Sequence, residues 1–262
     1  MRPTAEAMRQ NEPGSGLGGA VGGTAPLVSR MSPNYGPRLG GVLPDLIVLH
    51  HTAMKSNAAA LERLCDPMAE VSAHYLIGED GGIHALVPEE ARAWHAGAGY
   101  WGGKGDVNSR SIGIELTNAG PGGGFPPFPE AQMQALEALL GEIRARWSIP
   151  PAHIIANSDM APGRKSDPGP KFDWRRLALS GHSAWPNVTP SAHADADWPT
   201  FCEAATQVGY APPEGDWDAV LAAFRLRFRP GVHTAPLDGT DVALAEWLAA
   251  HHPFVDAVPS RA

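Results

Sequence analysis

Short apolar runs recur along the chain and predict the strands of a buried sheet. Residues 45–51 (DLIVLHH) form a nearly continuous apolar run rich in branched side chains, which is typical of a central strand. Residues 111–117 (SIGIELT) predict a second buried strand, and a short strand is expected at 153–156. Two further strand-like runs flank the GEDGG segment at 78–82, whose acidic and glycine residues suit a hairpin turn.

Helical spacing appears between these runs. Residues 129–147 repeat large apolar side chains at intervals of three and four, which predicts one amphipathic helix with a buried face: Met133, Leu136, Leu139, Leu140, Ile143 and Trp147. Residues 58–64 have helical spacing, and the Asp173 carboxylate suits the N-cap of a later helix. Strands that alternate with helices predict an α/β fold with a mixed central sheet flanked by helices.

Changes in composition divide the chain into parts. Residues 1–30, which include GSGLGGAVGGTA, hold few large apolar side chains and predict a flexible tail. A catalytic domain is expected at 31–182, and a polar, proline-containing linker at 183–197. Beyond the linker, a small three-helix domain over 198–262 is expected, with helical patterns at 198–208, 216–228 and 240–250.

Overall composition narrows the class of protein. With 262 residues and 43% apolar content, the chain can fill real cores and is not a disordered or fibrous protein. The net charge is −8 and no cluster of Lys and Arg offsets it, so nucleic acid is not an expected partner. The chain has two cysteines without metal-type spacing, which argues against a thiolate zinc site. No apolar run reaches the roughly 18 to 20 residues of a transmembrane segment.

Candidate chemistry gathers where strands end or turn, which is where α/β folds place their sites. In VLHHTA, His50 and His51 point to opposite faces of a strand, so only one of them can serve a given metal. Glu115 lies inside an apolar strand, and a buried carboxylate must be paired, hydrogen-bonded or used in chemistry. The segments SDMAPGRKSDPGP and RAWHAG add further polar or aromatic candidates, namely Lys165, Asp167, Trp94 and His95.

Four motifs in this order carry a specific resemblance: VLHHTA, VSAHYLIGEDGGIHALVPEEARAWHAG, NSRSIGIEL and MAPGRKSDPGPKFDW. They closely resemble the zinc-dependent N-acetylmuramoyl-L-alanine amidases of the AmpD/AmiD type, over roughly residues 32–179. The resemblance implies the fold shared with peptidoglycan recognition proteins. It also implies hydrolysis of the amide bond between the lactyl group of N-acetylmuramic acid, or its anhydro form, and L-Ala of the stem peptide. Peptidoglycan or a muropeptide is therefore the expected partner.

The resemblance also implies a site with one zinc ion, held by two histidines and an aspartate, and a water. His50 matches the first histidine ligand and Asp167 the aspartate ligand. Glu115 matches the glutamate that activates the water, and Lys165 the lysine that faces the developing oxyanion. Three residues of the matching motifs are expected to bind substrate: His74, Trp94 and His95. For His74, a hydrogen-bonded core position is the competing interpretation.

One position departs from the family. The second histidine ligand normally precedes Ser-Asp, whereas this chain has Asn157 before Ser-Asp. Asparagine offers only a neutral oxygen, which suits hard cations better than zinc, so zinc affinity and activity should fall. Two explanations are open. The asparagine is either an engineered change that traps uncleaved substrate or a natural divergence toward binding without turnover. The first is favoured because the other catalytic positions are intact, and the second makes a non-hydrolytic muropeptide-binding protein the alternative function.

The C-terminal segment resembles the three-helix peptidoglycan-binding domain often joined to such amidases. A structural or oligomerising bundle is the alternative interpretation. The chain shows no basic start followed by an apolar run, so a cytoplasmic location is expected, with the periplasm or cell envelope as the alternative that a wall-binding domain would favour.

Overall fold

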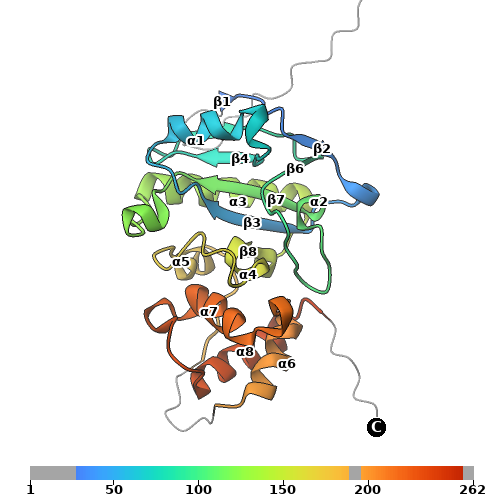
Figure 1. Ribbon diagram of the computed structural model, residues 1–262, viewed down its shortest axis with the longest axis vertical. Coiled ribbons are helices and arrows are strands. Elements are labelled where there is room, and N and C mark those ends of the chain that lie inside the picture. The colour runs from blue at the N-terminus through green and yellow to red at the C-terminus, as the bar shows by residue number, and fades with distance from the viewer. Residues whose placement is uncertain (1–27, 189–195, 256–262) are drawn as a thin grey trace, which may run out of the picture.

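The computed structural model describes residues 28–188 and 196–255, and its centre is a six-stranded mixed sheet (Figure 1). β4 and β5 are antiparallel, and the other neighbouring strands are parallel. In spatial order the strands are β1 (Val28–Ser29), β5 (Ile83–Ala85), β4 (Tyr75–Ile77), β7 (Ser111–Leu116), β3 (Leu46–His51) and β8 (Ile154–Ala156). The expected mixed central sheet and its hairpin are therefore confirmed.

Side-chain alternation along β3 assigns its residues to two cores. Ile47 and Leu49 pack with the apolar face of α3 (Glu130–Trp147), the amphipathic helix that the sequence predicts. Leu46 and Val48 point to the opposite face and belong to a second core. His50 continues the Leu46 and Val48 series, so its ring lies on the face of the sheet that α3 does not cover.

Shorter elements complete the first part of the chain. β2 (Tyr35–Pro37) and β6 (Ala91–Ala93) form a small antiparallel sheet that the sequence pattern did not indicate. α1 (Asn57–Leu64) begins after its Ser56 cap and packs in a small core with Leu76 and Leu86. The remaining helices of this part are α2 (Val107–Arg110), α4 (Asn157–Met160) and α5 (Trp174–Leu179).

Three helices follow near the C-terminus, as the sequence predicts: α6 (Trp198–Val208), α7 (Trp217–Phe228) and α8 (Gly239–His251). Aspartate side chains cap all three N-termini, from Asp197, Asp216 and Asp238. The three helices lie beyond the β8 edge of the sheet (Figure 1). Their apolar side chains share one continuous core with Leu46 and Val48 of β3.

Parts of the expected organisation fall on residues outside the described ranges. Residues 1–27 of the expected tail, 189–195 of the expected linker and 256–262 are among them. Val28 and Ser29, which the expected tail of residues 1–30 includes, pair in parallel with β5. Within the described part of the chain, no helix is both long and apolar enough to cross a bilayer.

Candidate active site

Three neighbouring parallel strands bring the candidate residues together at the carboxyl end of the sheet. His50 near the end of β3 is the direct register partner of Glu115 on β7. Asn157 follows the last residue of β8 and begins α4. The carboxyl ends of parallel strands form the usual ligand-binding crevice of open α/β sheets. Strand pairing alone therefore places three of the candidate residues side by side.

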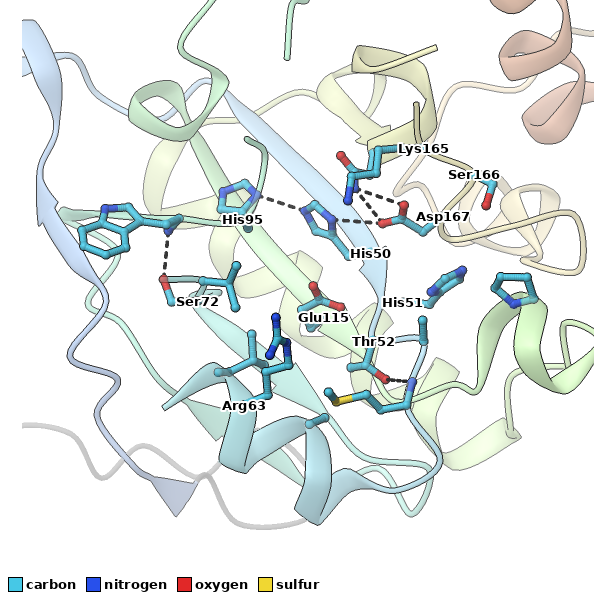
Figure 2. A pocket seen from close by; sticks show the side chains of 18 of the residues that line it. His50, His51, Thr52, Arg63, Ser72, His95, Glu115, Lys165, Ser166 and Asp167 are labelled. Carbon is cyan, nitrogen blue, oxygen red and sulfur yellow. Dashed lines mark hydrogen bonds and ion pairs between the residues drawn. The ribbon is translucent and has the colours of Figure 1, made fainter. Parts of the chain in front are cut away.

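A pocket of about 330 Å³ opens at the carboxyl end of the sheet (Figure 2). The lining includes every predicted site residue except His74, namely His50, Trp94, His95, Glu115, Asn157, Lys165 and Asp167. Pockets that hold a small ligand usually combine apolar walls with a few convergent polar groups. The polar groups of this pocket come from strand ends, from the loops after β6 and α4, and from α1.

His50, Asp167 and Asn157 form the centre of the site. His50 Nδ1 lies 3.1 Å from Asp167 Oδ2, and both side chains are buried. The Asn157 amide nitrogen donates to Oδ1 and Oδ2 of Asp167 at 3.1 and 2.9 Å. Burial alone would raise the pKa of Asp167, but its hydrogen bond and charge interaction with His50 outweigh burial and lower that pKa below its usual value. Asp167 is thus held as a carboxylate without any bound ion.

His95 supports His50 from the other side. His50 Nε2 lies 3.0 Å from His95 Nδ1, and His95 Nε2 lies 3.1 Å from the Ser111 hydroxyl. The His95 ring packs directly on Gly113, where an added Cβ would lie 2.4 Å from the ring. Glycine inside a strand often marks such a close approach. Gly113 in the motif IGIEL is the sequence signal for this contact, which the motifs alone did not predict.

His74 is the one predicted substrate-binding residue that lies away from the pocket. Its side chain is completely buried, and its Nδ1 accepts the Gly113 backbone N–H at 2.9 Å. Its Nε2 lies 3.3 Å from the Arg38 guanidinium and 3.1 Å from the Ala91 carbonyl oxygen. Burial lowers the pKa of His74 to about 3, so the ring is neutral. The expectation that His74 contacts substrate is therefore corrected: it links β4, β6 and β7 within the fold.

Glu115 has the environment of a proton acceptor. Its pKa is raised to about 7, mainly by burial and in part by nearby Asp167, against the opposing effects of His50 and Lys165. Its Oε2 has no hydrogen-bond partner among the described residues. A carboxylate whose pKa lies near neutrality can accept a proton in one step and release it in the next.

Two residues that the sequence analysis did not assign to the site also line the pocket. His51 lies at the end of β3, and its ring is close enough to Gly120 that an added Cβ there would contact it at 2.8 Å. The pocket extends around the strand end, so opposite side-chain directions do not exclude His51 from its lining. Arg63 on α1 is exposed and contributes a positive charge to the same wall (Figure 2).

The donor set fits zinc at two positions and not at the third. His50 Nδ1 and the Asp167 carboxylate are common zinc ligands. Asn157 directs its N–H groups toward Asp167, and its Oδ1 has no partner among the described residues. Residues 28–188 and 196–255 contain no group of three His, Cys, Asp or Glu side chains placed to hold a metal. Among the described residues, Asn157 therefore occupies the position where the resemblance implies a third ligand.

Comparison with known proteins agrees with this geometry. The family described as N-acetylmuramoyl-L-alanine amidase (Amidase_2) matches residues 40–170, which contain the predicted metal and catalytic positions. The amidase AmiD of Escherichia coli is 37% identical over 227 residues, which cover 78% of this chain and 81% of AmiD. The chain belongs to the N-acetylmuramoyl-L-alanine amidase family. The resemblance that the four motifs carry is therefore confirmed.

Solved structures extend the likeness to the fold of this amidase. The complex of E. coli AmiD with anhydro-N-acetylmuramic acid-L-Ala-D-gamma-Glu-L-Lys matches with a TM-score of 0.73 and 34% identity, over 85% of this chain and 93% of that one. AmpDh3 of Pseudomonas aeruginosa, solved with anhydromuramic pentapeptide, matches with a TM-score of 0.70 and 32% identity, over 86% and 96% of the two chains. The match covers most of each chain, so it includes more than the catalytic segment.

Proposed function

We propose that this amidase binds muramyl or anhydromuramyl peptides and hydrolyses the bond between the lactyl group and L-Ala, with low turnover because of Asn157. The observation that carries the proposal is the convergence of His50, Glu115, Lys165 and Asp167 on one pocket. A structural or recruiting role leaves a carboxylate with a pKa of about 7 inside that pocket unexplained. The relatives that crystallised with anhydromuramyl peptides support the substrate class.

The residues of this chain divide the chemistry between them. Glu115 accepts a proton from the attacking water, which its raised pKa permits near neutral pH. Lys165, an exposed cation on the pocket wall, stabilises the negative charge that develops on the carbonyl oxygen. Trp94 lines the same pocket and offers an apolar surface to the sugar or lactyl group.

One zinc ion is the cofactor that the family implies. His50 and Asp167 would hold it, and when bound it would polarise the substrate carbonyl and acidify a water. Asn157 contributes at most its neutral Oδ1, which has no hydrogen-bond partner among the described residues. Weak zinc binding is the proposed reason for low turnover.

A second candidate function follows from the Asn157 contact. Its two hydrogen bonds satisfy Asp167 without an ion, which would suit a protein that holds a muropeptide and does not cleave it. The two functions differ in a direct test: incubation with a zinc salt and anhydromuramyl tripeptide, followed by chromatography of the products. Slow release of free tripeptide supports the amidase. Stoichiometric binding with no release from this chain or from Asn157→His supports the binding protein.

A further inference from the structure

The carboxylate of Asp159 links α4, the helix that begins at the pocket residue Asn157, to the C-terminal helices. Asp159 lies in α4, two residues after Asn157, and is completely buried. Its Oδ2 accepts the backbone N–H of Ala156 at 2.9 Å. Its other two hydrogen bonds come from the C-terminal part of the chain: Tyr210 donates to Oδ1 at 2.7 Å, and Arg227 donates to Oδ2 at 2.9 Å.

Arg227 contacts a segment next to each of two central site residues, Asn157 and Asp167. Its guanidinium donates to the carbonyl oxygen of Ile154 at 3.1 Å, in the strand that leads to Asn157. The same group lies over the ring of Trp174 at 4.2 Å, in the helix that follows the Asp167 loop. One side chain of α7 therefore contacts the segment before Asn157 and the segment after Asp167.

α4 is too short to define its own position. It has four residues, and an isolated helix of that length is not stable, because nucleation costs more than one turn returns. The Ser158 N–H donates to the Asp167 carbonyl at 3.0 Å, so the first turn of α4 is tied to the Asp167 loop. A shift of Asp159 would therefore move Asn157 relative to Asp167. In Figure 1, α7 lies next to α4, and the two helices are in contact.

We propose that Arg227 and Tyr210 are positioning residues that act through Asp159 to set the place of Asn157 relative to Asp167. The C-terminal helices are then part of the scaffold of the active site. The inference rests on the proposed function in so far as positions 157 and 167 are ligand positions. The contacts that hold α4 in place do not depend on that function.

The chain provides a matched control on the same helix. Arg225 precedes Arg227 by two residues on α7 and is also completely buried. Its carboxylate partner is the buried Asp241, 3.0 Å from its Nε, and its remaining hydrogen bonds go to carbonyl groups of residues 232–236. Arg225→Met thus removes a buried charge within the C-terminal helices without removing a contact to α4.

The first experiment measures hydrogen–deuterium exchange of residues 157–160 in Arg227→Met, Tyr210→Phe and Arg225→Met. Each variant is studied at the same interval below its own melting temperature, so that global stability is matched. We expect exchange at Ser158 to rise about tenfold or more in Arg227→Met and by a smaller factor in Tyr210→Phe, because local opening becomes easier. We expect Arg225→Met to change it less than about twofold.

The second experiment measures cobalt(II) affinity and the visible absorption of the cobalt site in the Asn157→His background. We expect Arg227→Met to weaken cobalt binding by about 10-fold or more and to alter the spectrum, as changes behind metal ligands do. Arg227→Lys should restore part of the affinity, because it keeps a cation near Asp159. Arg225→Met should leave affinity and spectrum unchanged.

The outcomes separate the inference from the proposed function. Equal exchange at residues 157–160 in the Arg227→Met and Arg225→Met variants overturns the inference, and so does unchanged cobalt affinity in Arg227→Met. If Asn157→His binds no cobalt, the proposed metal amidase fails and the exchange data still decide the role of Arg227. If Arg227→Met does not fold, Tyr210→Phe decides, since it removes one hydrogen bond and keeps the buried ring.

Discussion

The amide of Asn157 donates hydrogen bonds to both carboxylate oxygens of Asp167, at 3.1 and 2.9 Å. The family resemblance implies that these two positions are ligand positions of one zinc ion, with a histidine where this chain has Asn157. In this chain the Asn157 amide and the His50 ring together pair the buried Asp167 carboxylate. The contact engages the amide nitrogen of Asn157, which leaves the neutral Oδ1 as the one atom of this side chain that could be a metal ligand.

Asn157→His should therefore restore metal binding. We expect zinc affinity to rise by more than about 100-fold, because even changes to groups behind a ligand cost about 10- to 100-fold. Elemental analysis after dialysis against a weak chelator measures zinc per chain, and Asn157→Ala is the control that removes the amide without adding a ligand. Equal zinc loading in this chain and in Asn157→His would show that Asn157 does not limit the site.

Glu115→Gln should stabilise the metal-free protein at alkaline pH. The pKa of Glu115 is about 7 in the folded protein, above its ordinary value of 4.5. Below pH 4.5 the carboxyl is protonated in both the folded and the unfolded chain, so it makes the free energy of unfolding no more dependent on pH. Above pH 7 it is charged in both, and the folded state bears the cost of burial, so stability falls as pH rises between these values.

Thermal unfolding in the presence of EDTA, at pH 4.5 and at pH 8, checks this prediction. The melting temperature of Glu115→Gln should exceed that of the parent chain at pH 8 and match it near pH 4.5. Glu142→Gln is the control, since that carboxylate lies on the exposed surface of α3. A stabilising effect of equal size at both pH values would argue against a raised pKa at Glu115.

Lys165→Ala should lower turnover more than substrate affinity. In the Asn157→His background we expect kcat to fall by about 10²- to 10³-fold, because loss of one group that stabilises an oxyanion has an effect of that order. KM should change by less than about threefold, since the charge develops only in the transition state. Steady-state kinetics with anhydromuramyl tripeptide measures both, and Lys171→Ala, outside the pocket, is the control.

His74→Ala and Trp94→Ala should separate stability from binding. His74→Ala removes the acceptor of the Gly113 N–H and leaves polar groups unpaired, which should cost about 1–3 kcal/mol of the free energy of unfolding. Trp94 lines the pocket, so its loss should weaken muropeptide binding with a smaller effect on stability. Urea denaturation and calorimetric titration measure the two effects. Weaker muropeptide binding by a stably folded His74→Ala variant would show that His74 does contribute to substrate binding.

Local sequence patterns predicted the main elements, and the family resemblance supplied the candidate site residues. The apolar runs at Leu46–His51 and Ser111–Leu116 became neighbouring parallel strands, and α3 has its predicted buried face. Side-chain spacing determines these elements because it reflects which positions can be buried together. Motif order then assigned His50, Glu115, Lys165 and Asp167, all of which line the pocket.

Tertiary structure decided the roles that depend on contacts between distant segments. His74 and His95 lie in similar motifs, yet one is enclosed between three strands and the other lines the pocket beside His50. Sequence spacing does not predict the four-residue helix that begins at Asn157, since so short a segment has no periodicity of its own. It is held by hydrogen bonds from Arg227 and Tyr210, about 50 to 70 residues away in sequence. Sequence patterning thus determined which segments fold, and long-range packing decided where their polar groups meet, because each buried polar group needs a partner that only the folded chain supplies.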